Sequence, residues 1–135
     1  MKNILLSYPY NETESFFVAN LQQELEYNGN QVKSIMESTK DSSNAGEVIP
    51  NYINGCNLVI AILGDGSNVF YDLGYAMSKN KKILLVSDGT HVMHSYLDTI
   101  PDIVMRNNNK NLDDDNITIS KILNFVNKIE SDQIE

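Results

Sequence analysis

The chain has 135 residues, a size that one domain with a single core accommodates without disulfides or structural metal. Its formal net charge of −8 and its single arginine argue against DNA, RNA and anionic membrane surfaces as partners and favour a small ligand. The single cysteine, Cys56, excludes an internal disulfide, and no apolar run approaches the roughly 20 residues that span a bilayer. We therefore expect one cytoplasmic domain over residues 1–135.

The first half of the chain alternates short apolar runs with helical periodicity. Residues 4–6 predict a short buried strand, and a helix follows that ends at an Asn-Gly stop signal. The apolar positions of this helix recur at helical intervals: Phe17, Val18, Leu21 and Leu25. Residues 32–36 predict a second strand. After a polar loop, residues 47–54 predict a short helix, because Pro50 is tolerated only in a first turn.

The middle of the chain has the clearest pattern, a strand-helix-strand crossover. Residues 58–63 form an apolar run rich in branched side chains, and the turn Gly64-Asp65-Gly66 follows it. An amphipathic helix then begins at Ser67 or Asn68 and ends near residue 78. Residues 82–86 form the next apolar run, and therefore a strand parallel to the first.

The last third of the chain completes the sheet. Residues 103–105 predict a short fifth strand, and the apolar positions between 119 and 129 predict a final helix that the acidic run 113–115 caps. Five strands alternating with helices predict an α/β fold, a doubly wound five-stranded parallel sheet of flavodoxin-like order 2-1-3-4-5. The loops after strands one, three and four then share one crevice, where ligands of such sheets bind.

Asp72 is the candidate for chemistry. It lies about one turn into the crossover helix, where the helix dipole favours an ionised carboxylate by roughly 0.3–1 kcal/mol. Packing the apolar face of this helix inward leaves the face of Asp72 and Tyr75 at the crevice. An anion at this position can stabilise or trap a positive charge that develops in a bound substrate. The alternative is an exposed acid that only stabilises its helix.

These residues also carry a resemblance. Asn68-Val-Phe-Tyr-Asp-Leu-Gly-Tyr-Ala76, followed by Lys81-Lys-Ile-Leu-Leu-Val86, resembles the N-V-x-Y-E-L-G-x-A helix and K-P-I/V strand of two families. They are the nucleoside 2-deoxyribosyltransferase-like proteins and the nucleotide-active Toll/interleukin-1 receptor-like (TIR-like) domains, and Ser7-Tyr8 suits both. The resemblance implies that the helix carboxylate attacks or stabilises the anomeric carbon and that an N-glycosidic bond is cleaved. Asp72 matches the family glutamate and is one methylene shorter.

Other polar residues at the predicted strand ends are candidates for holding a base, sugar or phosphate: Ser7, Gly64, Asp65, Gly66, Asn68, Ser87 and Asp88. The glycine turn allows close approach of a phosphate to the backbone, and the alternative is a plain tight turn. Tyr8 orients the Asp72 carboxylate, stacks on a base, or is an ordinary half-buried tyrosine. Simple strand termination explains Ser87 and Asp88 as well as ligand binding does.

Neither a metal nor a cofactor is expected. His91 and His94 are three residues apart and lack a clear third ligand. The run 113–115 lacks the spacing and the glycine of a calcium loop.

The leading hypothesis is an enzyme that cleaves the N-glycosidic bond of a nucleoside or nucleotide, NAD included, or transfers its deoxyribosyl group. Water as acceptor gives hydrolysis, and a second base gives transfer. The alternative is a non-catalytic TIR-like module that binds a nucleotide signal or a protein partner, and a third hypothesis is an interaction protein that retains only the fold. Tyr96, Ile100, Ile103 and the last helix supply either a contact between copies in a homo-oligomer or ordinary core.

Overall fold

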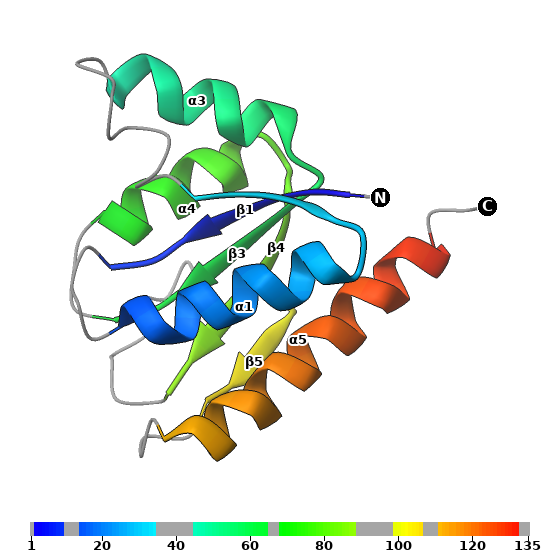
Figure 1. Cartoon of the computed structure of the whole chain (residues 1–135). Coiled ribbons are helices and arrows are strands. Elements are labelled where there is room, and N and C mark those ends of the chain that lie inside the picture. The colour runs from blue at the N-terminus through cyan, green and yellow to red at the C-terminus, as the bar shows by residue number, and fades with distance from the viewer. Residues whose placement is uncertain are drawn as a thin grey trace.

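A computed structural model of the chain describes residues 2–9, 14–34, 45–64, 68–88, 99–106 and 111–132, with the backbone alone at 45–48 and 130–132. It is a parallel sheet with helices on both faces (Figure 1). The strands are β1 (Asn3–Ser7), β2 (Gln31–Ser34), β3 (Leu58–Ile62), β4 (Lys82–Ser87) and β5 (Ile103–Met105). The described helices are α1 (Ser15–Tyr27), α3 (Ala45–Gly55), α4 (Asn68–Ser78) and α5 (Leu112–Asp132).

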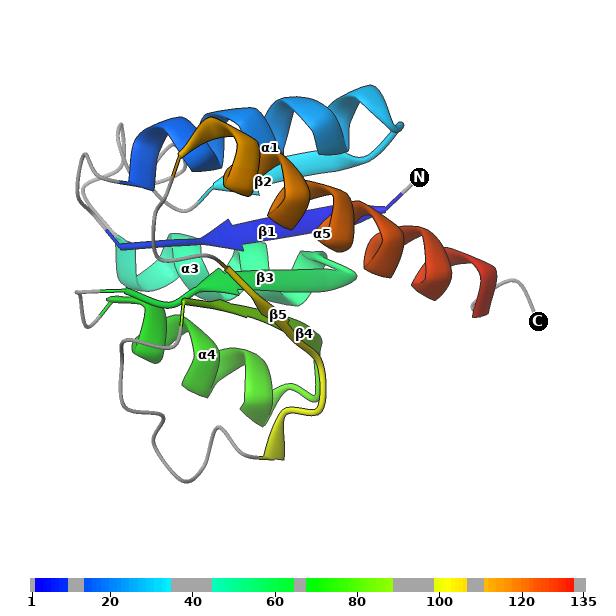
Figure 2. The ribbon, with the colours of Figure 1, turned by 90° about the horizontal axis from the view of Figure 1, so that it is seen from below.

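The sheet has the order β2-β1-β3-β4-β5, and every neighbouring pair is parallel, which confirms the predicted topology. α1 and α5 cover one face, and α3 and α4 cover the other (Figure 2). Successive strand residues point to opposite faces, so β1 divides its side chains between two cores. Ile4 and Leu6 pack toward α1 and α5, whereas Leu5 packs toward α3 and α4. β1 and β3 are buried along their apolar length because both faces are covered.

The helix boundaries follow local signals with some corrections. α1 stops where predicted, because Gly29 adopts a φ of 92° that a side chain disfavours. α4 begins at Asn68, also as predicted. α3 begins at Ala45, two residues before the predicted start, so Pro50 lies in its second turn and not its first. α5 begins at Leu112 and includes the acidic run in its own first turn, since the amide of Asp114 is capped by the side chain of Asn111 at 2.9 Å.

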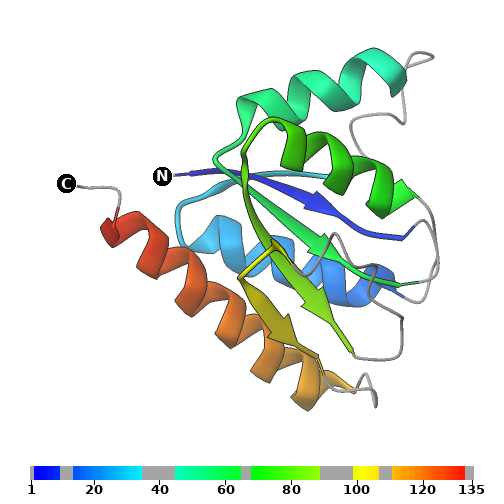
Figure 3. The ribbon, with the colours of Figure 1, turned by 180° about the vertical axis from the view of Figure 1, so that it is seen from behind.

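α4 lies across β3 and β4 on one side of the sheet (Figure 3), and this packing carries its apolar face inward. No described helix is long and apolar enough to cross a membrane.

Candidate active site

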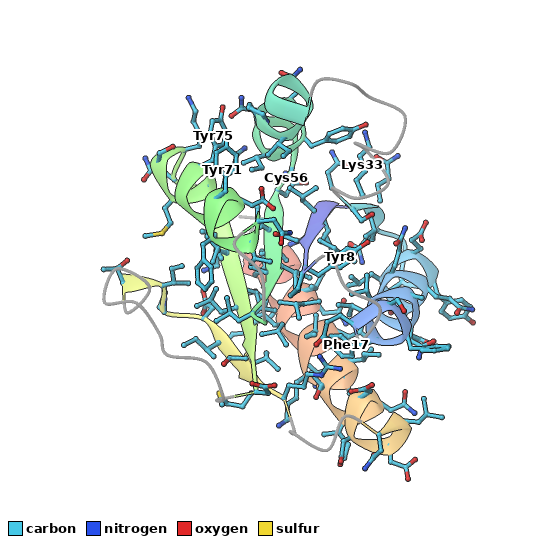
Figure 4. The ribbon with its side chains drawn as sticks, turned by 90° about the vertical axis from the view of Figure 1, so that its left-hand side faces the viewer. Tyr8, Phe17, Lys33, Cys56, Tyr71 and Tyr75 are labelled. Atoms are coloured by element: carbon cyan, nitrogen blue, oxygen red, sulfur yellow. The ribbon has the colours of Figure 1, made fainter. Side chains whose placement is uncertain are left out.

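The carboxyl ends of β1, β3 and β4 meet at one edge of the sheet, the edge toward the viewer in Figure 4. Ser7 is the last residue of β1, Gly64 follows β3 by two residues, and Ser87 is the last residue of β4. The chain segments after β1 and β3 touch, because a Cβ added at Gly64 would lie 2.7 Å from Cγ of Pro9. Glycine at position 64 therefore leaves room for Pro9, while the pairing of Ser7 with Ala61 places the two strand ends side by side.

Asp72 points into the protein at this edge. It is 1% exposed, and Oγ of Ser7 donates a hydrogen bond of 2.7 Å to its Oδ2. The expected open position at a crevice is therefore not what the structure has. The physical reason is its place on α4: Asp72 lies beside Leu73 and three residues after Val69, so it borders the buried face of the helix.

Burial changes the acidity of this carboxyl group. Desolvation raises the pKa of Asp72 from 3.8 to about 6, and the hydrogen bond from Ser7 opposes that rise because it favours the charged form. At pH 7 roughly nine in ten molecules still carry the ionised carboxylate. The group is thus a buried anion near neutrality and a neutral acid in mildly acidic solution.

Tyr8 and Asn68 lie next to this pair with roles of their own. The Tyr8 side chain packs against the core on the α1 side, which Figure 4 shows it facing, because it lies one residue beyond Ser7 and points to the other face. The hydroxyl that contacts Asp72 therefore belongs to Ser7, which corrects the orienting role expected of Tyr8. Nδ2 of Asn68 donates to the carbonyl oxygen of Tyr8 at 2.8 Å and so ties the start of α4 to the end of β1.

The other predicted ligand contacts fall partly within the described structure. Ser87 is buried, and its carbonyl oxygen accepts the amide of Arg106 at 2.7 Å. Asp88 follows it and is half-buried. Asp65, Gly66 and the two histidines lie outside the described residues. Among the residues that are described, no group of three or more acidic, histidine or cysteine side chains is arranged to hold a metal ion.

A charged cluster near the same edge was not predicted from the sequence. The guanidinium of Arg106, just after β5, binds the carboxylates of Glu14 and Asp115 and lies 4.0 Å from the centre of the Phe17 ring. All three charged groups are buried, and the Nη2 of Arg106 lies 3.3 Å from Oδ1 of Asp115. The one sequence signal for this cluster is that an acidic chain keeps a single arginine. The cluster joins β5 to the starts of α1 and α5.

Two cavities lie away from Asp72. One of about 140 Å³ lies against β1, β2 and α3, with Lys33, Tyr52 and Cys56 among its lining residues. Burial raises the pKa of the Cys56 thiol, so this cysteine is a poor nucleophile. The other, of about 410 Å³, lies at the opposite edge of the sheet, beside Lys82 and Asp102.

No protein-family model matches this chain, and no curated protein does. Solved structures do match. CMP N-glycosidase BcmB from Clostridium botulinum is similar over 92% of this chain and 99% of its own, with a TM-score of 0.70 and 20% identity. A 2-deoxyribosyltransferase from Bacillus psychrosaccharolyticus is similar over 73% of this chain and 81% of its own, with a TM-score of 0.60 and 22% identity.

A third solved structure, CapF with the inhibitor 3-isopropenyl-tropolone, is similar over 78% of this chain and 29% of its own. Its TM-score is 0.54 and its identity 16%. At these identities the likeness concerns the fold. The chain therefore has a nucleoside 2-deoxyribosyltransferase-like fold, as its sequence indicated.

Proposed function

We propose that this protein breaks the N-glycosidic bond of a nucleoside, with Asp72 as the carboxylate that acts on the anomeric carbon. The observation that carries the proposal is a buried aspartate at the carboxyl edge of a parallel sheet, held at one oxygen by Ser7. The fold adds support, because two solved structures that share it are named as an N-glycosidase and a 2-deoxyribosyltransferase.

The proposed reaction has two halves. The ionised Asp72 attacks the anomeric carbon, or stabilises its developing positive charge, while the bond from that carbon to the base nitrogen breaks and the base leaves with the bonding electrons. The leaving base takes a proton from solvent. Water then attacks the anomeric carbon, the bond from that carbon to Asp72 breaks and returns the free carboxylate, and the proton of the water passes to solvent, which gives hydrolysis. A second base that attacks in the same way and loses its proton to solvent gives transfer. Because Asp72 is 1% exposed, the groups that cover it have to move when a substrate binds.

The remaining predicted residues hold the substrate in this proposal. The amides of Gly64 and Gly66 and the side chain of Asp65 bind the sugar or base from the segment after β3. Ser87 and Asp88 line the same edge from β4. Asn68 contributes indirectly, since its amide nitrogen is engaged with the carbonyl of Tyr8.

The charge of the surrounding segments favours an uncharged nucleoside over a nucleotide. The segments after β1, β3 and β4, at 8–14, 63–67 and 88–99, contain no lysine or arginine and five acidic residues. Among the segments that connect the end of a strand to the next helix, those that contain a lysine follow the outer strands β2 and β5, at Lys40 and Lys110. Arg106 is already engaged with two buried carboxylates. A 5′-phosphate at this edge would therefore find no lysine or arginine in these three segments to pair with it.

The test is to incubate the protein with deoxynucleosides, ribonucleosides, their monophosphates and NAD and to measure the free base by chromatography. We expect base release that is lost in Asp72→Asn and retained in Asp102→Asn. Asp102 is the matched control because it is an aspartate at the opposite edge of the sheet, in a surface ion pair with Lys82. Absence of any release, or equal release from the two variants, would refute the proposal.

One observation favours a second candidate function, a non-catalytic module of the TIR-like kind. Asp72 is 1% exposed, so its carboxylate is not open to a bound nucleoside, as is expected of an acid without a catalytic role. A ligand that binds only the folded protein raises its apparent stability. An increase in thermal unfolding temperature with a nucleoside or nucleotide, without release of base, would favour this second function.

A further inference from the structure

We propose that Ser7 is the positioning residue of the site: its hydroxyl fixes the Asp72 carboxylate in the orientation from which Oδ1 faces the sugar. This inference rests on the function proposed for Asp72. Its basis is the buried hydrogen bond of 2.7 Å from Oγ of Ser7 to Oδ2 of Asp72, which joins residues 65 positions apart in the sequence. One oxygen is thereby held, so the carboxyl group cannot rotate freely about its last side-chain bond.

The backbone beneath Ser7 is well suited to hold another group in place. β1 is an inner strand, paired with β2 on one side and β3 on the other. Ser7 itself pairs with Ala61 of β3, and its neighbour Leu6 pairs with both Ser34 and Ile60. Ser7 is 0% exposed. A serine on such a strand has little freedom, so it transmits the position of the sheet to the carboxylate.

The alternation of side chains between the two faces of β1 explains why Ser7, and not a neighbour on the strand, contacts Asp72. Leu5 packs toward α3 and α4, so Ser7, two residues later, points to the same side. Leu6 and Tyr8 pack toward α1 and α5. Ser7 is therefore the last side chain of β1 that reaches α4. The bond from Asn68 to the carbonyl of Tyr8 holds the start of the same helix against the same strand end.

Among the residues that the structure describes, Ser7 is the side chain whose hydrogen bond favours the ionised form of Asp72. β1 and β3 carry no charged side chain, and Lys82 of β4 is at the other end of that strand. The described side chains of α3 are uncharged. α4 itself carries Tyr71 and Tyr75, and the other described acids that follow these strands at this edge are Asp88 and Glu14, which is paired with Arg106. A hydroxyl that donates to the charged form favours ionisation and offsets burial.

The experiment measures the titration of Asp72 by carbon-13 NMR of its carboxyl group, which the Asp72→Asn variant identifies. We expect Ser7→Ala to raise the pKa of Asp72 by about one pH unit, a tenfold change in proton affinity. Ser7→Thr keeps the hydroxyl and should stay near the wild-type value. Ser34→Ala is the matched control, because Ser34 is also a buried serine at the end of a neighbouring strand.

The same variants report on the reaction. In Ser7→Ala the acid limb of the pH profile for base release should move upward with the pKa, and kcat at neutral pH should fall about tenfold or more while KM changes little. If Ser7→Ala does not fold, Ser7→Cys keeps the volume with a weaker donor and should show the same direction. An unchanged Asp72 pKa and acid limb in a folded variant overturn the inference. If the wild-type protein releases no base but Ser7→Ala still shifts the pKa of Asp72, the proposed reaction is wrong and the contact between Ser7 and Asp72 is confirmed.

Discussion

Replacing Asp72 by asparagine should make the protein more stable at neutral pH. The folded protein holds the Asp72 proton more tightly than the unfolded chain, because burial raises the pKa from 3.8 to about 6. Between these values the folded state binds more protons, so the contribution of this group to stability falls as pH rises. Above pH 6 the full cost of a buried anion is present, and below pH 3.8 none of it is.

The size of the effect follows from the two pKa values. They differ by about 2 pH units, and each pH unit is worth 1.36 kcal/mol, so the ionised group costs up to about 3 kcal/mol at pH 7.5. Asparagine has nearly the shape of the protonated acid, and its oxygen can still accept the hydrogen bond from Ser7. Its amide group also needs a partner, which costs part of the gain. We expect Asp72→Asn to be about 1–3 kcal/mol more stable at pH 7.5.

The assay is urea unfolding followed by far-ultraviolet circular dichroism, for wild type and Asp72→Asn, at several pH values from 4 to 7.5. The advantage of Asp72→Asn in unfolding free energy should fall by about 2 kcal/mol between pH 7.5 and pH 4, and all other titrating groups cancel in the difference. Asp102→Asn, which removes a surface partner of Lys82, should change stability by less than about 0.5 kcal/mol. A difference that does not depend on pH, or a less stable Asp72→Asn at pH 7.5, would refute the reasoning.

Three further predictions concern packing, charge and substrate. Gly64→Ala should lower the free energy of unfolding by about 1–3 kcal/mol, because its Cβ would lie 2.7 Å from Cγ of Pro9. Gly74→Ala in α4 has open space around its Cβ and should raise the free energy of unfolding by about 0.5–1 kcal/mol. Urea unfolding of both variants checks this prediction, and equal effects would contradict it. Arg106→Met should lower the free energy of unfolding by about 3–5 kcal/mol, since two buried carboxylates lose their partner. Lys128 is exposed, so Lys128→Met should change the free energy of unfolding little in the same assay. Comparable losses in the two variants would refute the stabilising role of the Arg106 cluster. Steady-state kinetics should give a kcat/KM for a nucleoside at least about tenfold above that for its 5′-monophosphate, and the reverse preference would contradict the charge argument.

A functional acid that weakens the fold is consistent with the proposed chemistry. A carboxylate that is meant to meet a developing positive charge is best kept poorly solvated, and the free protein then bears the cost of that desolvation. If Asp72→Asn is both more stable and inactive, the two results together would distinguish a catalytic acid from a structural one.

The order of the strands in the sheet could be predicted from local patterns in the sequence. The apolar runs, the Asn-Gly stop before β2 and the glycine turn after β3 are local signals, and right-handed crossovers leave few ways to connect five parallel strands. The same local signals located Asp72 about one turn into α4. They were less accurate at two helix starts: α3 begins at Ala45, two residues earlier than predicted, and α5 begins at Leu112, where the side chain of Asn111 caps the first turn.

Which side chains contact one another could not be predicted, because it depends on how the helices pack on the sheet. The pairing of Ser7 with Asp72, the packing of Tyr8 on the other face and the burial of Arg106 between Glu14 and Asp115 join residues far apart in the chain. The helical period predicts on which face of its helix a residue lies. How deeply that face is buried depends on how the helix packs on the sheet. Asp72 borders its apolar stripe, so a small rotation of α4 separates a buried carboxylate from an exposed one.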